Sequence, residues 1–328
     1  MNRHPLTILN EQSALVTVEM TGDAPVEDAL PKNWFDTLAG GTDAAAEAYE
    51  KALVELNSHP DVELVLPSVQ SMDTDRLEAE ELQRLTAIYT AVNKHCQEMS
   101  RFSHNRIGFG QVPGVEEESI ISNAKELAEN LVSERLVLVA PGHVVGAAVG
   151  RISRLPVFEA PTGKSLFLDT EITPVFAVES RHALLKEKVM PVVGQRRTRA
   201  ITLVQGITTD GGQINMRRTA DQAIRGVRAI GEGFLGRLNN KEVRTALRQK
   251  LTAFLLSMEK EGAILPSMDG RDPAFKVNVY AGPADDPAFE VNVHEEQADL
   301  LQGIVRVELA VRPARAIDYI YATVLVQD

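Results

Sequence analysis

The sequence has almost no cysteine, few aromatic residues and no long apolar run. Cys96 is the only cysteine among 328 residues. The chain therefore cannot form an internal disulfide, and a reducing compartment is the simplest interpretation. No stretch of about 18 apolar residues is present, which predicts no stable membrane insertion. The residues after Met1 do not form the apolar run of a signal peptide, so we expect a soluble intracellular protein.

Positive charge is also scarce. Lysine and arginine total 34 against 46 aspartates and glutamates, which gives a formal net charge of -12. Repulsion from phosphate groups opposes general nucleic-acid binding by such a chain, so we expect no nucleic-acid partner. The charge is unevenly distributed, because residues 216–250 contain nine basic and three acidic residues and sum to +6. The rest of the chain must then sum to -18.

The basic stretch has two interpretations. It is either a solvated helix face with internal ion pairs or a cationic surface that docks on an acidic partner. No aromatic platform accompanies the arginines, which again disfavours nucleic acid. The candidate interaction residues are Arg217, Arg218, Arg225, Arg228, Arg244 and Arg248.

The sequence lacks recognisable catalytic motifs. Residues 163–165 resemble the end of a phosphate-binding loop, but Phe158 stands where that motif requires glycine. There is no Gly-x-Ser-x-Gly or His-Glu-x-x-His sequence, and the seven histidines do not fall at metal-ligand spacing. His95 and Cys96 are adjacent in a predicted helix, which favours a packed thiol and a surface imidazole over a catalytic pair. We therefore expect no enzyme activity, catalytic residue, cofactor or metal.

Hydrophobic periodicity predicts an α/β core in the first two thirds of the chain. Helical spacing covers 44–56, 75–99 and 116–131, and short apolar runs at 62–66, 106–109 and 135–140 predict strands. This alternation predicts a mixed, largely parallel sheet with covering helices. A further helix, through residue 150, is rich in glycine and alanine, where backbones can approach closely.

The C-terminal third predicts a different, α+β arrangement. After a strand at 199–204, helices are expected at 216–235 and 241–261. The sequences DPAFKVNV at 272–279 and DPAFEVNV at 286–293 form an imperfect duplication, which suits two strands joined by a turn. Two more strands are expected at 303–311 and 317–326. We divide the chain into an N-terminal strand or arm segment (1–37), an α/β core domain (38–210) and a C-terminal domain (211–328).

Several short motifs follow one another in an order that resembles a known family. They are LAGGTD at 38–43, VELVLP at 62–67, PVFEAP at 156–161, INMRRTAD at 214–221 and the closing strands from 303 and 317. In this order the chain resembles the sheath proteins of contractile bacteriophage tails and related injection machines over about 38–328. The Pro-Gly-Val arm and the extra outward-facing domains found in many members of that family are not evident.

The resemblance implies a structural role. A sheath subunit polymerises as a helical cylinder of stacked rings around an inner tube, and contracts to drive that tube through a target envelope. The implied partners are further copies of the chain, the inner tube protein, and the baseplate and tail terminator proteins. The implied location is the virion tail, which is assembled in the bacterial host cytoplasm.

The resemblance also gives two segments a role. The terminal strand, with Ile317, Tyr319, Tyr321 and Val324, can be exchanged between subunits by adding to a neighbour's sheet. A closing strand of its own sheet is the equal alternative. The basic helix region becomes a candidate contact with an acidic inner tube or with another sheath subunit. The alternative functions are a tail-completion or adaptor protein that forms closed rings, and an α/β enzyme with an unrecognised site.

Overall fold

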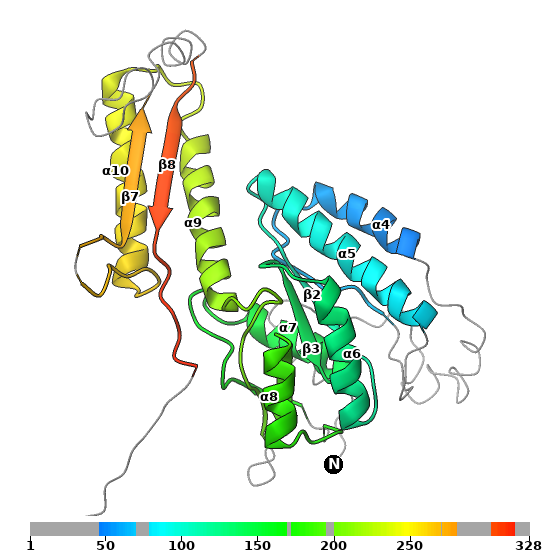
Figure 1. The fold of residues 1–328 in the computed structure, drawn as a ribbon. Coiled ribbons are helices and arrows are strands. Elements are labelled where there is room, and N and C mark those ends of the chain that lie inside the picture. Colours follow the sequence, from blue (N-terminus) through cyan, green and yellow to red (C-terminus); the bar gives the residue numbers. More distant parts are fainter. Residues whose placement is uncertain are drawn as a thin grey trace, which may run out of the picture. The chain divides into compact units, whose positions relative to one another are not determined.

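A computed structural model describes residues 46–69, 79–168, 172–194, 200–269, 271–280 and 303–318 (Figure 1). These residues belong to one compact unit, 44–328. The predicted N-terminal segment and the 38–43 motif lie outside the described residues. The predicted domain boundaries at 37/38 and 210/211 stay predictions.

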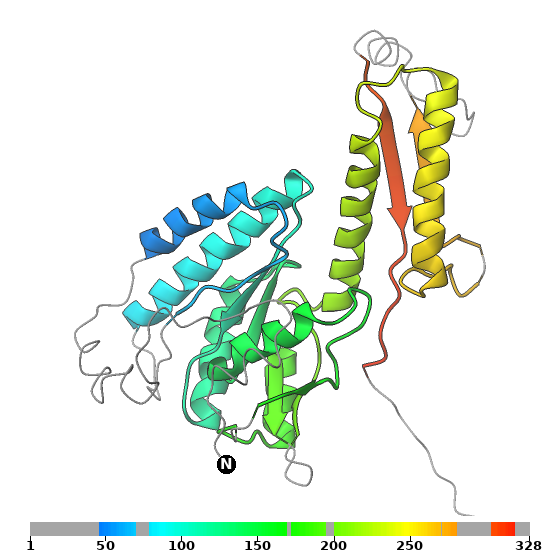
Figure 2. The same cartoon turned by 180° about the vertical axis from the view of Figure 1, so that it is seen from behind.

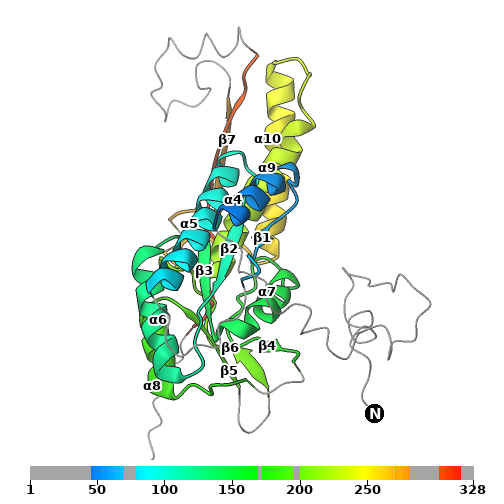
Figure 3. The same ribbon diagram turned by 90° about the vertical axis from the view of Figure 1, so that its right-hand side faces the viewer.

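A six-stranded sheet forms the centre of the α/β core, in the order β1-β2-β3-β5-β6-β4 (Figure 3). The strands are β1 (Leu64–Val65), β2 (Ile107–Gln111), β3 (Leu136–Ala140), β4 (Ser165–Leu166), β5 (Met190–Gly194) and β6 (Ile201–Leu203). Strands β1, β2, β3 and β5 are parallel, whereas β6 runs antiparallel to both β5 and β4. The prediction of a mixed, largely parallel sheet is confirmed.

Helices cover both faces of this sheet. They are α4 (Ala46–Glu55), α5 (Ala79–Arg101), α6 (Glu117–Asn130), α7 (Val145–Ser153) and α8 (Val178–Lys186), with single 3-10 turns at Leu56–Ser58 and Gly142–Val144. Successive β3 side chains point to opposite faces. Leu138 packs in one cluster with Tyr89 of α5 and Ile120 of α6. Val139 packs in the other cluster with Ile152 of α7. The wholly apolar sequence of β3 therefore reflects burial on both sides.

The glycines of α7 do not mediate a close approach to another described segment. A Cβ placed on Gly146 or Gly150 would meet no described atom within 4 Å. The prediction of close backbone packing at these positions is therefore wrong for the described chain. Close approach occurs instead at Gly110 of β2, where a Cβ would lie 3.1 Å from the Tyr89 ring.

Two long helices and a two-stranded sheet follow the core (Figures 1 and 2). They are α9 (Ile214–Glu232), α10 (Lys241–Lys260), β7 (Phe275–Tyr280) and β8 (Arg306–Val311). β7 and β8 are antiparallel, with Phe275 opposite Val311. Val277 and Leu309 share a cluster with Leu255 of α10, so one sheet face packs on that helix. The second copy of the duplicated sequence, 286–293, lies outside the described residues.

Candidate assembly interface

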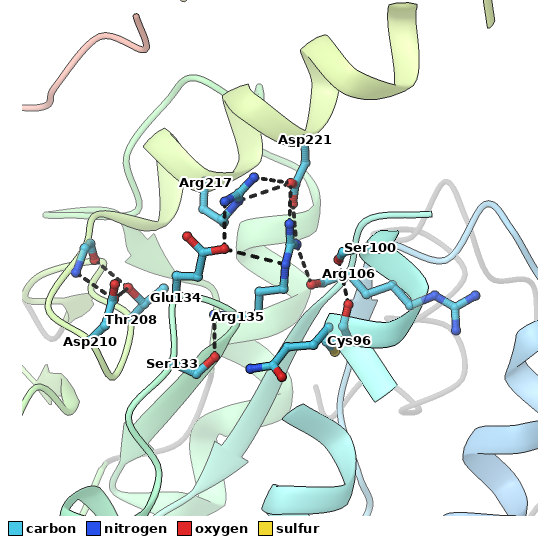
Figure 4. Close-up of polar contacts among 12 residues, drawn as sticks. Cys96, Ser100, Arg106, Ser133, Glu134, Arg135, Thr208, Asp210, Arg217 and Asp221 are labelled. Atoms are coloured by element: carbon cyan, nitrogen blue, oxygen red, sulfur yellow. Dashed lines mark hydrogen bonds and ion pairs between the residues drawn. The ribbon is translucent and has the colours of Figure 1, made fainter. Parts of the chain in front are cut away.

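The first turns of α9 are tied to the core by a buried ion pair (Figure 4). Arg135, immediately before β3, donates from Nη1 to Asp221 Oδ2 and from Nη2 to Oδ1, both over 3.1 Å. Both side chains are buried, with 6% and 3% of their surface exposed. Arg217 adds a 2.9 Å bond to Asp221 and another to Glu134. Two guanidinium groups thus bind one buried carboxylate and fix α9 beside the start of β3.

Arg218 caps the C-terminal end of helix α7. Its side chain is buried and donates to the carbonyl oxygens of Ile152, at 3.0 Å, and Leu155, at 3.3 Å. These carbonyls lie at the C-terminal end of α7, where helices leave acceptors without intrahelical partners and where a cation is favoured. Burial lowers the pKa of the Arg218 guanidinium. In the single chain this residue is therefore an internal cap and not a surface cation.

The next two arginines of α9 reach residues that precede other strands. Arg225 donates to Glu63 Oε1 at 2.6 Å and also to the Asn105 carbonyl, just before β1 and β2 respectively. Arg228 donates to the Phe102 carbonyl at 2.6 Å and to Glu232 at 2.9 Å. Together with the Arg217–Glu134 contact, these bonds connect α9 to the amino-terminal ends of three adjacent parallel strands.

Among the residues that the structure describes, the two candidates on α10 contact neighbouring parts of the C-terminal region and not the α/β core. Arg244 donates to Asn239 Oδ1 at 2.9 Å, and Arg248 donates to the Val279 carbonyl at 2.9 Å. The six predicted interaction residues therefore form two groups, four bound to the core and two on α10. Their role in an interface stays a prediction.

The segment after β8 is fastened to the core at residues 316–318, where the predicted exchange strand begins. The Gln213 side chain donates to the Ala316 carbonyl and accepts from the Ala316 amide, both at 3.0 Å. Thr162 donates to Asp318 Oδ1 at 3.0 Å. Ile317 is 77% exposed and belongs to no strand in the described part of the chain. The other members of the predicted strand, Tyr319, Tyr321 and Val324, lie outside the described residues.

His95 and Cys96 form no catalytic pair. Cys96 is buried as predicted, and burial raises the pKa of its thiol to about 12, which keeps it protonated. The predicted surface imidazole is wrong, because His95 is also buried and its Nε2 lies 2.5 Å from Arg106 Nη1. Burial, reinforced by the Arg106 charge, lowers the pKa of His95, so the neutral ring accepts this hydrogen bond. Both side chains are therefore packed in the protein interior, where they contribute to the fold.

The described ranges show neither a metal-ion site nor a membrane-spanning helix. There, no three His, Cys, Asp or Glu side chains group in a way that could hold a metal ion. None of the helices in those ranges is both long and apolar enough to cross a membrane.

Sequence reasoning missed the residues on the other side of the α9 contacts. The position of Arg135 could have indicated a buried ion pair, because a cation next to a strand buried on both faces needs a partner. Asp221 lies four residues after Arg217, the spacing of an intrahelical ion pair, but its bond to Arg135 has no local signature. Gln213 carried no sequence signal for its contacts with Ala316.

The sequence matches no family model and none of the curated proteins. Solved structures do match. A chain of the anti-feeding prophage helical sheath in its contracted state has a TM-score of 0.59 and 14% identity, covering 85% of this chain and 74% of that one. A chain of the six-fold symmetrised baseplate of the same prophage has a TM-score of 0.61 and 14% identity, and the match covers 85% of this chain and 72% of that one. A chain of the contracted sheath complex of an extracellular contractile injection system, PVC, has a TM-score of 0.57 and 15% identity. This match covers 74% of this chain and 68% of that one.

These likenesses extend over most of this chain at low sequence identity, so they concern the fold. They agree with the order of motifs found in the sequence. The chain has the fold of contractile tail sheath proteins.

Proposed function

We propose that this chain is a structural subunit of a contractile tail sheath, which polymerises as a helical cylinder around an inner tube and contracts to drive the tube through a target envelope. The observation that supports this proposal most directly is the similarity in fold to the anti-feeding prophage helical sheath over 85% of the chain. A repeated contact between unlike surfaces that does not close on itself generates such a helix of subunits. The role is one of assembly and requires no catalytic residue or cofactor.

The partners follow from this role. They are further copies of the chain in stacked rings, the inner tube protein, and the baseplate and tail terminator proteins. The subunit would act in the tail of a virion or injection device and be assembled in the cytoplasm of the bacterial host.

The terminal strand is proposed as the link between subunits. Its root is held by Gln213 and Thr162, so a strand that starts near Ile317 leaves from a fixed point on the core. A strand with Tyr319, Tyr321 and Val324 could then pair with a neighbour's sheet edge through backbone hydrogen bonds. Such a link persists while the globular parts of two subunits rotate relative to each other.

The contacts of the six arginines narrow the proposed interaction residues. Arg217, Arg218, Arg225 and Arg228 are engaged with the core and serve the fold first. Among the described residues, Arg244 and Arg248 donate hydrogen bonds to neutral groups and not to carboxylates, so their charges remain available to a carboxylate of another molecule. These two are the stronger candidates for contact with the tube or a second subunit.

Negative-stain microscopy of the chain produced with its inner tube protein tests the function. Hollow striated cylinders are expected. Closed rings alone would instead favour an adaptor or tail-completion protein, and a persistent monomer at high concentration would contradict both assembly roles.

The strand link has its own test. Truncation after Asp318 retains the anchored root, and should abolish cylinders while leaving a monomer with an unchanged unfolding temperature. Cylinders of normal length from this truncated chain would contradict strand exchange.

A further inference from the structure

Within the basic stretch 216–250, the exposed and half-buried cations without a carboxylate partner follow α9 in the sequence. Beyond α9, no acidic residue in the described ranges pairs with Arg237, Lys241, Arg244, Arg248 or Lys250. Only Glu242 opposes them in the sequence 237–250, which therefore sums to +4. On α9, by contrast, Arg217, Arg225 and Arg228 pair with Glu63, Glu134, Asp221 and Glu232. Arg218 is buried against backbone carbonyls. The unneutralised charge belongs to the connection between α9 and α10 and the first half of α10.

This connection also exposes apolar side chains. Leu235 and Leu238 are 78% and 77% exposed, three residues apart. Arg237 and Lys250 lie over the Phe234 ring, with distances to its centroid of 4.7 and 5.6 Å. We call residues 234–241 together with Lys250 the basic tip. It is an apolar surface bordered by cations, a composition that suits a partner with acidic and apolar side chains.

The basic tip has a fixed shape. Asn240 caps α10 by accepting from the Val243 amide at 2.9 Å, and Asn239 donates to the Ile304 carbonyl at 3.3 Å. Gly236 has a φ of +78°, a left-handed conformation that favours glycine. Because the backbone is already ordered, binding at this surface costs little conformational entropy. Two exposed leucines on an ordered turn contribute little to folding and are available for an interface.

The chain itself contains a sequence of complementary chemistry. Residues 281–302, between β7 and β8, have six acidic residues and no lysine or arginine, a net charge of -6. Apolar residues such as Phe289, Val291 and Leu300 lie among the acidic ones. Every copy of the chain therefore carries both a cationic, apolar surface and an acidic, apolar segment. In an assembly of identical subunits, both can be used at one repeated contact.

We propose that the basic tip of one subunit binds the acidic segment 281–302 of a second copy. The leucines supply the apolar contact, and the cations set the orientation and the salt dependence of the association. This inference concerns self-association, so it does not depend on contraction or on an inner tube.

Sedimentation velocity of the full chain with paired charge reversals tests the proposal. The tip variant carries Arg237→Glu and Lys241→Glu, and the segment variant carries Asp285→Lys and Asp286→Lys. Each variant alone should self-associate at least about tenfold more weakly than the original chain at low salt. An equimolar mixture should recover association, because the original tip of one variant meets the original segment of the other. Lys260→Glu, on α10 outside the basic tip, is the matched control and should change nothing.

Three results would overturn the proposal. The first is that self-association recovers in a single chain with all four reversals but does not recover in the mixture. That result would place the contact within one chain. Unaltered self-association of both variants would remove the basic tip from the subunit interface. Loss of co-assembly with the inner tube protein, without loss of self-association, would assign the surface to the tube instead. An unchanged unfolding temperature in each variant ensures that the effects are on association.

Discussion

Arg135 and Asp221 form a two-bond ion pair across 86 residues of sequence, and both side chains are almost completely buried. The pair joins the residue before β3 to the second turn of α9. Since Arg217 also binds Asp221, one carboxylate holds two guanidinium groups in place. Asp221 is therefore the buried acidic side chain at the centre of the contacts between α9 and the start of β3.

Replacing Asp221 with asparagine should destabilise the protein strongly. The change removes the buried carboxylate that pairs with Arg135 and leaves that guanidinium only the exposed Glu134, 3.9 Å away. Loss of one partner of a buried ion pair typically costs about 3–5 kcal/mol. Urea unfolding followed by circular dichroism measures the loss. Glu232→Gln is the matched control, because its exposed pair with Arg228 should contribute at most about 1 kcal/mol. Equal effects of the two substitutions would contradict the assignment of Asp221 as the central anchor.

The packing of α9 against α10 gives a second prediction. A Cβ on Gly226 would lie 2.1 Å from Cζ of Phe254, so Gly226→Ala forces the ring or the helix to move. We expect a destabilisation of about 1–3 kcal/mol. Gly231→Ala, on the same helix, meets no described atom within 4 Å and should stabilise by up to about 1 kcal/mol through helix propensity. Thermal unfolding of both variants checks the opposite signs, and a stabilised Gly226→Ala would contradict this packing.

The elements that could be predicted are those whose pattern is local. The apolar run at 135–140 predicted β3, and the helix expected at 241–261 ends within one residue of the observed end of α10 at Lys260. Strand β5 was missed because Pro191 and Gly194 are residues that usually interrupt strands. Its pairing with β3 begins at Met190 and Pro191, so the sheet context overrides the local preference.

The candidate site was less predictable because its partners are distant in sequence. The arginines were identified as a charged group, but Arg225 pairs with Glu63, 162 residues away. Charge counting shows that the basic stretch exists and cannot show which of its cations are already neutralised. Only the folded arrangement separates the α9 arginines from those on α10.

Acid should weaken the protein through His95. The folded pKa of this histidine is lowered from its usual 6.5, so the unfolded chain takes up the proton first. Its contribution to stability is therefore complete above about pH 6.5 and is lost progressively as the pH falls below that value. The groups around the ring are Arg106, which disfavours the imidazolium, and Glu98, which favours it.

His95→Gln separates this effect from the titration of other groups. Glutamine can still accept from Arg106 but does not titrate, so the variant should lose less stability than the original chain between pH 7.5 and 5.5. Denaturant unfolding at both pH values gives the comparison. Identical pH dependence in the two proteins would show that His95 has no shifted titration.

The anchor of the C-terminal segment supplies the last prediction. Gln213→Ala removes both bonds to Ala316, which should cost about 1–2 kcal/mol and release the backbone before the exchange strand. The Ala316 amide, which donates to Gln213 Oε1, should then exchange its hydrogen faster, and assembly should weaken because the strand no longer leaves from a fixed point. Hydrogen exchange read by mass spectrometry tests the first effect without any polymer. Gln249→Ala, on the exposed side of α10, should alter neither exchange at Ala316 nor assembly. Rapid exchange at Ala316 with normal assembly would mean that the anchor serves the monomer alone.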